Sequence, residues 1–262
     1  MVRLFLSASL ILAAARAHDT WLQPERFAAT PGAVLGVGLT SADGFFGADT
    51  AIKPDRVARL LGRLGGGAVG FAAPQEGGKA LVFSATLTRP GVAVLGVELK
   101  PRLLELAPDK IELYFREVHA GDELRAAWAA VPAPRRWRES YVKHAKTFVR
   151  VGEPLAGDRA WAEPLGLALE IVPERDPTAL QAGDELPVRV LRGGAPLAGF
   201  MLAFVSAGET REHVVMTDEQ GRAGATLDAR GAWLVHGTDL RRAAAPDREW
   251  DSDFATMVVE AR

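Results

Sequence analysis

The chain opens with an apolar run that is too short to cross a bilayer. Met1-Val2-Arg3 gives a positive start, the run from Leu4 to Ala14 is almost entirely apolar, and Ala15-Arg16-Ala17 places small residues where a signal peptidase reads. A membrane span needs about 20 apolar residues. We therefore predict a secretory signal peptide over residues 1–17, cleaved after Ala17. An amphipathic N-terminal helix and an uncleaved anchor are the alternatives.

Residues 18–152 begin with short apolar segments that are broken by Gly and Pro, a pattern typical of β-structure. We expect strands over 33–39, 81–87 and 92–99. Apolar side chains at helical spacing then predict a helical insertion. Its expected pieces are a helix that starts at Pro108-Asp109 and runs to 118, a second over 124–131, and an amphipathic stretch over 138–149.

The remainder, residues 160–262, has the pattern of an all-β domain, with Gly152-Glu153-Pro154 as the edge of a linker. Short strands bounded by turn residues predict a small antiparallel sandwich. They are expected over 165–172, 186–191, 199–205, 214–217, 223–227, 233–235 and 254–260. The predicted fold is therefore mainly β: two β-sandwich-like parts, residues 18–152 and 160–262, with a helical insertion in the first.

Composition narrows the classes of function. The formal net charge is −2, so no basic excess exists to neutralise a nucleic-acid backbone, and nucleic-acid binding is not expected. The absence of cysteine excludes disulfides, thiolate zinc sites, iron–sulfur clusters and a cysteine nucleophile. No later segment is long and apolar enough to span a membrane. After signal cleavage we expect a soluble, non-spanning protein outside the cytoplasm, in a bacterial periplasm.

Several segments together carry a family resemblance. The predicted mature start, His18-Asp19-Thr20-Trp21-Leu22-Gln23-Pro24, resembles the AHDxWLxP opening of a family of exported bacterial proteins. Further similar segments follow in order at 138–146, 166–173, 183–188, 196–199, 217–223, 231–235 and 250–256. The family is a domain of unknown function, and its members are often described as the periplasmic component of an ABC-type cobalt/nickel transport system (NikM-like). The resemblance implies an Ig-like or prealbumin-like second sandwich, export, and a role in divalent-metal uptake with a membrane transporter as partner.

The sharpest chemical feature is His18 at the predicted mature terminus. A terminal histidine offers an α-amine and an imidazole nitrogen, and both bind nickel or copper once deprotonated. A second imidazole would complete a brace around the ion. We expect it from His236, in a loop after the 233–235 strand, or from His144, on the amphipathic 138–149 stretch. The predicted ligand is a divalent transition metal: nickel or cobalt by resemblance, copper by the chemistry of a terminal histidine.

Each histidine also has a simpler interpretation: a surface residue beside the cleavage site for His18, a half-buried structural residue for His144, and an ordinary loop residue for His236. Signatures of enzymes are lacking, since the sequence has no Gly-x-Ser-x-Gly elbow, phosphate loop or dinucleotide fingerprint. We therefore predict a non-enzymatic metal-binding protein. A cell-envelope interaction or scaffold module without metal is the alternative, and an oxidative enzyme built on a copper brace is a third hypothesis.

Overall fold

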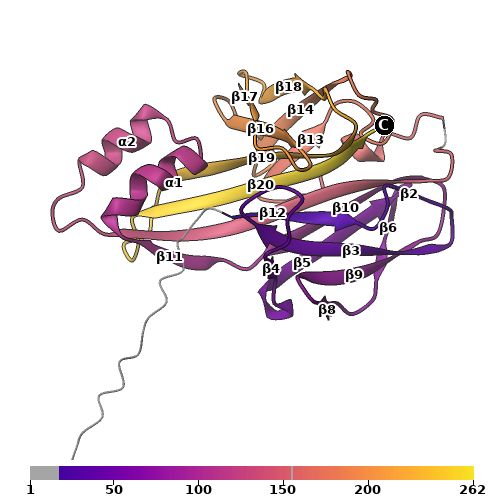
Figure 1. Ribbon diagram of the computed structural model, residues 1–262, viewed down its shortest axis with the longest axis horizontal. Helices are drawn as coiled ribbons and strands as arrows, with labels where there is room; N and C mark the ends of the chain where they lie inside the picture. The colour runs from indigo at the N-terminus through magenta and orange to yellow at the C-terminus, as the bar shows by residue number, and fades with distance from the viewer. Residues whose placement is uncertain (1–17, 155) are drawn as a thin grey trace, which may run out of the picture.

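A computed structural model describes residues 18–154 and 156–262 of the chain (Figure 1). The predicted signal peptide, residues 1–17, lies outside the described residues. Three β-layers are stacked, with the longest strands in the middle layer and the helices at one end of it. The predicted mainly β class, with sandwich-like parts and a helical insertion, is confirmed.

The middle layer is a ten-stranded sheet, the central sheet, built from both halves of the sequence. In order across the sheet its strands are β17 (His213–Met216), β16 (Met201–Ser206), β19 (Gly231–Arg242), β20 (Trp250–Ala261), β12 (Trp137–Val151), β10 (Gly91–Leu99), β5 (Val57–Leu64) and β6 (Gly67–Ala68), with β11 (Arg102–Leu106) and β2 (Ala28–Ala29) attached to β12. Strand β12 pairs antiparallel with β10 and parallel with β20. One sheet therefore runs across the boundary expected from the sequence.

Two smaller sheets cover the central sheet. The N-terminal sheet holds β1 (Asp19–Pro24), β3 (Ala33–Ala42), β9 (Ala80–Leu87) and β7 (Gly70–Phe71), with β4 (Thr50–Ala51) on β3 and β8 (Gln75–Gly77) on β9. The C-terminal sheet holds β13 (Leu169–Pro173), β14 (Glu185–Arg192) and β15 (Ala195–Pro196), with β18 (Arg222–Thr226) on β14. Neighbouring residues of β12 enter different cores: Phe148 packs toward the C-terminal sheet and Val149 toward the N-terminal sheet. Because side chains alternate along a strand, the two small sheets lie on opposite faces of the central one.

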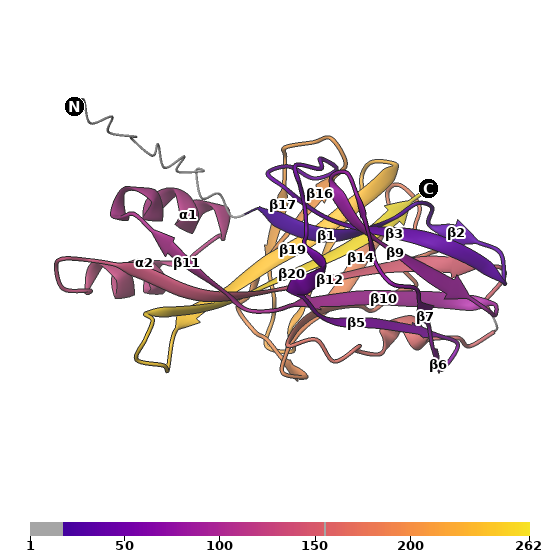
Figure 2. The ribbon, with the colours of Figure 1, turned by 90° about the horizontal axis from the view of Figure 1, so that it is seen from below.

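The helical insertion forms a lobe at one end of the molecule (Figure 2). Helices α1 (Ile111–Glu117) and α2 (Asp122–Ala129) pack on the ends of β12 and β20, as the spacing of apolar residues predicts. Trp137 and Trp250 stack there with ring centroids 4.6 Å apart. Three short 3-10 turns complete the structure: Pro54–Arg56, Pro108–Lys110 and Ala160–Ala162.

The helix expected over 138–149 is wrong, because this stretch lies inside strand β12. A strand covered on both faces loses the polar–apolar alternation by which a strand is recognised. Here the buried positions include the polar residues Glu139, His144, Lys146 and Thr147. The helical pattern came from the spacing of Tyr141, His144, Ala145 and Phe148, which is coincidental in a strand. His144 therefore stands on a strand, in the layer between two cores.

Candidate binding cavity at His18

His18 is placed by the pairing of the first two long strands. It directly precedes β1, and the antiparallel register sets Asp19 opposite Ala42 of β3. The residue after Ala42 is Asp43, whose Oδ1 lies 2.5 Å from Nε2 of His18. The His18 side chain is 40% exposed, so it remains open to an incoming ligand. A carboxylate at Nε2 fixes a proton on that nitrogen and leaves the lone pair on Nδ1.

His236 lies inside strand β19, so the loop expected for it is wrong. Its ring is buried between two carboxylates, with Nδ1 3.1 Å from Asp19 Oδ2 and Nε2 3.3 Å from Glu212 Oε1. The second contact is an ion pair rather than a well-formed hydrogen bond. Burial alone would lower the pKa of His236, but the two carboxylates outweigh it and raise the pKa to about 10. The ring is thus an imidazolium, which has no lone pair for a metal ion.

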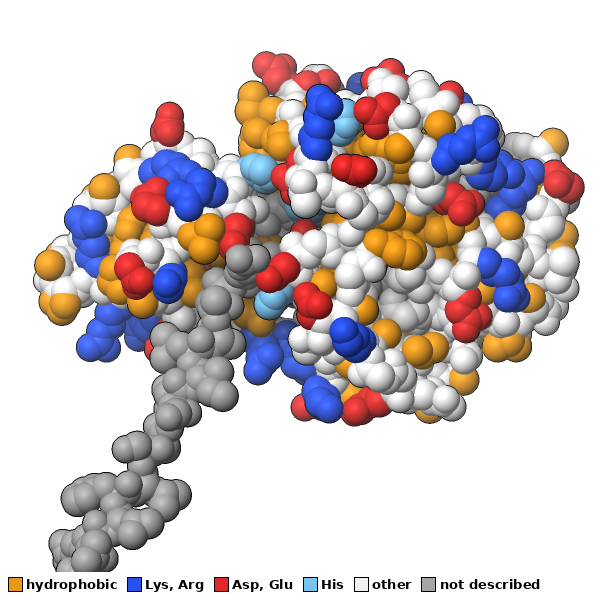
Figure 3. Space-filling model, viewed as in Figure 1, with side chains coloured by type: hydrophobic (Ala, Val, Ile, Leu, Met, Phe, Trp, Pro, Cys, Tyr) orange, Lys and Arg blue, Asp and Glu red, His pale blue; other side chains and the backbone are white. Residues whose placement is uncertain are grey.

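Glu212 joins two histidines from different parts of the fold. Its Oε2 lies 3.1 Å from Nε2 of His119, the residue that follows the end of α1, while Oε1 faces His236. The hydrogen bond from His119 and the contact with His236 hold the pKa of Glu212 well below its usual range. Carboxylates and imidazoles therefore alternate from Asp19 through His236 and Glu212 to His119. In Figure 3, histidine and acidic side chains gather along the hollow between the helical lobe and the rest of the molecule.

His144 lies on the face of the central sheet that is covered by the C-terminal sheet. It shares the face of Lys146 and Phe148, which is turned toward the C-terminal sheet. Its side chain is 1% exposed, and Nε2 lies 2.7 Å from Asp253 Oδ1. The structure therefore does not bring His144 to His18 or His236. Among the described residues, no group of three or more His, Cys, Asp or Glu side chains is arranged to hold a metal ion.

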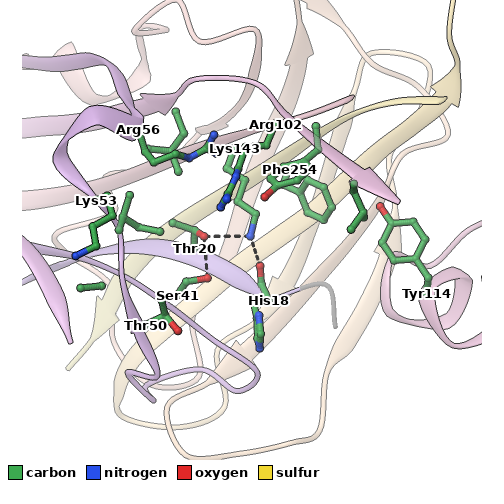
Figure 4. A pocket seen from close by; sticks show the side chains of 15 residues that line it. His18, Thr20, Ser41, Thr50, Lys53, Arg56, Arg102, Tyr114, Lys143 and Phe254 are labelled. Atoms are coloured by element: carbon green, nitrogen blue, oxygen red, sulfur yellow. Dashed lines mark hydrogen bonds between the residues drawn. The ribbon is translucent and has the colours of Figure 1, made fainter. Parts of the chain in front are cut away.

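A cavity of about 340 Å³ opens beside His18 (Figure 4). Its walls come from β1, β3, β4, β10, β11, β12 and β20, from helix α1 and from the turn before β5. Lys143 of β12 reaches into it and donates hydrogen bonds to the carbonyl of His18 and, over 3.1 Å, to Oγ1 of Thr20. The Thr20 hydroxyl in turn donates to Oγ of Ser41 over 3.1 Å. The backbone next to His18 is thus held by a lysine from the middle of the central sheet.

Lys143 is the electrostatic centre of this cavity. Burial lowers the pKa of its ammonium to about 8, Asp19 partly offsets this shift, and Arg56 adds to it. The ammonium also lies over two aromatic rings, 5.8 Å from the centroid of Tyr141 and 5.4 Å from that of Phe254. Sequence analysis missed Lys143 because it stands one position from His144 in a stretch read as a helix. Only the strand alternation separates the two side chains onto opposite faces.

Comparisons with known proteins give a family but no activity. The model of a family described as a domain of unknown function (DUF4198) matches residues 15–238. No curated protein matches the sequence. No helix of the described residues is long and apolar enough to cross a membrane.

Solved structures show only a faint likeness. The Escherichia coli adhesin FdeC has 14% identity and a TM-score of 0.25, with 95% of this chain and 67% of that chain covered. The ectodomain of mouse nectin-like molecule 4 has 12% identity and a TM-score of 0.19, with coverages of 93% and 64%. The Yersinia pseudotuberculosis adhesin InvE has 12% identity and a TM-score of 0.22, with coverages of 92% and 58%. This chain thus spans about two thirds or less of their lengths, and at these TM-scores the likeness carries no argument.

Proposed function

Because this chain belongs to the DUF4198 family, whose function is unknown, we propose from its geometry that it is an exported, non-enzymatic binding protein that captures a divalent transition metal ion at His18. Nickel, cobalt or copper would be the cargo, and a membrane transporter the receiver. The alternative, an envelope scaffold module without metal, is one outcome of the test below.

The contact between His18 and Asp43 carries this proposal. With Nε2 only 2.5 Å from the carboxylate, Nδ1 keeps its lone pair. Cleavage after Ala17 would free the α-amine of the same residue. The amine and Nδ1 then close a six-membered ring around one ion, and both nitrogens bind nickel and copper well. The amine has an ordinary pKa of about 8, so it gives up its proton readily to a metal at neutral pH.

The other predicted histidines have different roles in this proposal. His236 is held as an imidazolium between two carboxylates, and His144 is buried on the opposite face of the sheet. Neither completes the brace expected from the sequence. The remaining positions on the ion would be filled by water or by a further small ligand. That openness suits a protein that must release its cargo.

The test is a calorimetric titration of Ni²⁺, Co²⁺ and Cu²⁺ into protein recovered from a periplasm, with mass spectrometry to identify its first residue. We expect one ion per chain when the protein starts at His18. One extra residue before His18 should weaken binding sharply, and Asp43→Asn should weaken it about tenfold or more. His213→Gln removes another partly exposed histidine and serves as the matched control for His18→Gln.

Equal affinities for the extended and unextended chains would overturn the role of His18. If no ion binds to a chain that starts at His18, the scaffold alternative gains, and crosslinking in the periplasm should then recover a protein partner.

A further inference from the structure

We propose that the cavity beside His18 is a binding site for a small organic anion, whose acid group is held by Lys143, Arg56 and Arg102. This inference concerns the lining of the cavity rather than His18 itself. It goes beyond metal capture and can be true or false independently of it.

The charges that line the cavity all have one sign. Lys53, Arg56, Arg102 and Lys143 contribute to its wall, and none of the fifteen lining residues is an aspartate or glutamate. Like charges that gather on one concave surface repel each other and raise the local concentration of anions. The lysine and arginine side chains of the wall therefore favour an anion in the cavity.

Three of these cations have no carboxylate partner. Lys53 pairs with Glu76 over 3.3 Å, but within residues 18–154 and 156–262 no ion pair joins Arg56, Arg102 or Lys143 to an acidic side chain. Arg56 makes only a 3.4 Å contact with the carbonyl of Pro101. Burial, with Arg102 adding to it, lowers the pKa of Arg56, while Tyr141 and Asp55 act in the opposite direction. An anion between them would relieve this mutual repulsion.

Donors for an anion are available at the same place. An ammonium has three N–H groups, and Lys143 uses two of them on the carbonyl of His18 and the hydroxyl of Thr20. One donor remains. The guanidinium groups of Arg56 and Arg102 can pair with both oxygens of a carboxylate or a phosphate. Thr50 adds a hydroxyl to the wall.

Apolar side chains also contribute to the wall, which indicates that the ligand has an organic body. Leu99, Leu104 and Phe254 line the cavity beside the charged groups. Its volume of about 340 Å³ is at the lower end of the roughly 300–1,000 Å³ typical of small-molecule sites. A bare inorganic ion would leave the apolar wall uncovered, and a polymer would not fit. The apolar surroundings also strengthen an ion pair formed inside.

The probes for a test are citrate and benzoate, titrated separately by calorimetry into the metal-free protein at low salt and pH 7. We expect one anion per chain for at least one probe, and inorganic phosphate should bind more weakly. Arg56→Gln and Lys143→Met should each weaken binding about tenfold or more, as the loss of a charge-assisted contact implies. Arg26→Gln removes an exposed arginine outside the cavity and should leave the affinity unchanged.

Failure of both probes to bind at millimolar concentration would overturn the proposal, as would an equal loss in Arg26→Gln. Lys143→Met also removes a contact that holds the backbone of His18, so Arg56→Gln and Arg102→Gln keep the test valid if that variant does not fold.

Repeating the citrate titration with nickel–citrate identifies the source of the anion. If citrate binds and nickel–citrate binds no more tightly, the natural ligand is a free anion. If nickel–citrate binds more tightly, and Arg56→Gln removes this binding, the natural ligand is the chelator that carries the metal ion. Metal titrations without citrate test His18 separately.

Discussion

Lys146 Nζ lies 2.8 Å from Glu170 Oε1, and neither side chain is more than 2% exposed. This ion pair joins β12 of the central sheet to β13 of the C-terminal sheet. The Glu170 carboxylate also accepts backbone N–H groups of the loop before β13, from Leu165, Gly166 and Leu167. Burial alone would raise the pKa of Glu170, but Lys146 and the backbone N–H groups of Leu165 and Leu167 together outweigh it and lower the pKa, which favours the carboxylate.

Removing one member of this pair should destabilise the fold strongly. Lys146→Met leaves the Glu170 carboxylate buried without its cation, which costs about 3–5 kcal/mol in comparable pairs. Lys79→Met changes an exposed lysine in the same way and should alter the free energy of unfolding by less than about 0.5 kcal/mol. Urea denaturation measures both values. A loss below about 1 kcal/mol for Lys146→Met would show that the pair does not hold the two sheets together.

A second buried carboxylate attaches the helical lobe. The Tyr114 hydroxyl of α1 donates to Glu139 Oε1 over 2.7 Å, and Trp137 Nε1 donates to Oε2 over 2.8 Å. Tyr114→Phe removes one donor from a buried acceptor and should cost about 1–3 kcal/mol. Tyr141→Phe makes the same change in another tyrosine that lines the cavity and serves as the control. Thermal unfolding of the two variants compares them, and equal melting temperatures would contradict the assigned role of Tyr114.

The charge of His236 should make stability fall as the pH rises. Folding raises its pKa from about 6.5 to about 10, so the folded state binds more protons than the unfolded state between these values. The contribution is fully present below pH 6.5 and is lost as the pH passes 10. Lys143, whose pKa is lowered to about 8, acts in the opposite direction at higher pH. The readout is therefore the difference in unfolding free energy between wild type and His236→Gln, measured from pH 6 to 10. A difference that stays constant would refute the ion-pair assignment.

Anion binding should also depend on pH through Lys143. Because the pKa of its ammonium is about 8, the free cavity loses this charge as the pH rises through 8, and affinity for citrate should fall. Lys143→Arg keeps its proton at pH 9 and should retain its affinity there. Titrations at pH 7 and pH 9 on both proteins provide the measurement. An affinity that is the same at both pH values in the wild type would exclude Lys143 from the site.

Local patterns in the sequence were enough to predict strands that are bounded by turn residues and a helix that carries one apolar stripe. Strands 33–39 and 81–87 have turn residues at their ends, and the apolar stripe of 111–118 matches helix α1. Strand β12 was misread because cores on both faces remove the polar side by which a strand is recognised.

The residues of the candidate site also fall into two groups: those that a local sequence signal indicates and those that only the fold brings together. His18 was identified from the predicted cleavage position, which is a local signal. Its partner Asp43 depends on the register between β1 and β3, and Lys143, Arg56 and Arg102 come from three different elements. Nothing in their spacing indicates that they meet. The structure does not bring His144 to His18 for a related reason, since one step along a strand moves a side chain to the opposite face.

The position of β12 has a consequence for how the chain acquires its structure. Its partner on one side is β10 (Gly91–Leu99) and on the other β20 (Trp250–Ala261), which follows β12 along the chain only after the whole C-terminal sheet. Until β20 arrives, β12 has an unpaired edge and one uncovered face, and such edges join readily to other chains. The two sandwiches therefore cannot mature one after the other during synthesis. Native structure must wait for β20, which gives a holding chaperone a long interval in which to act.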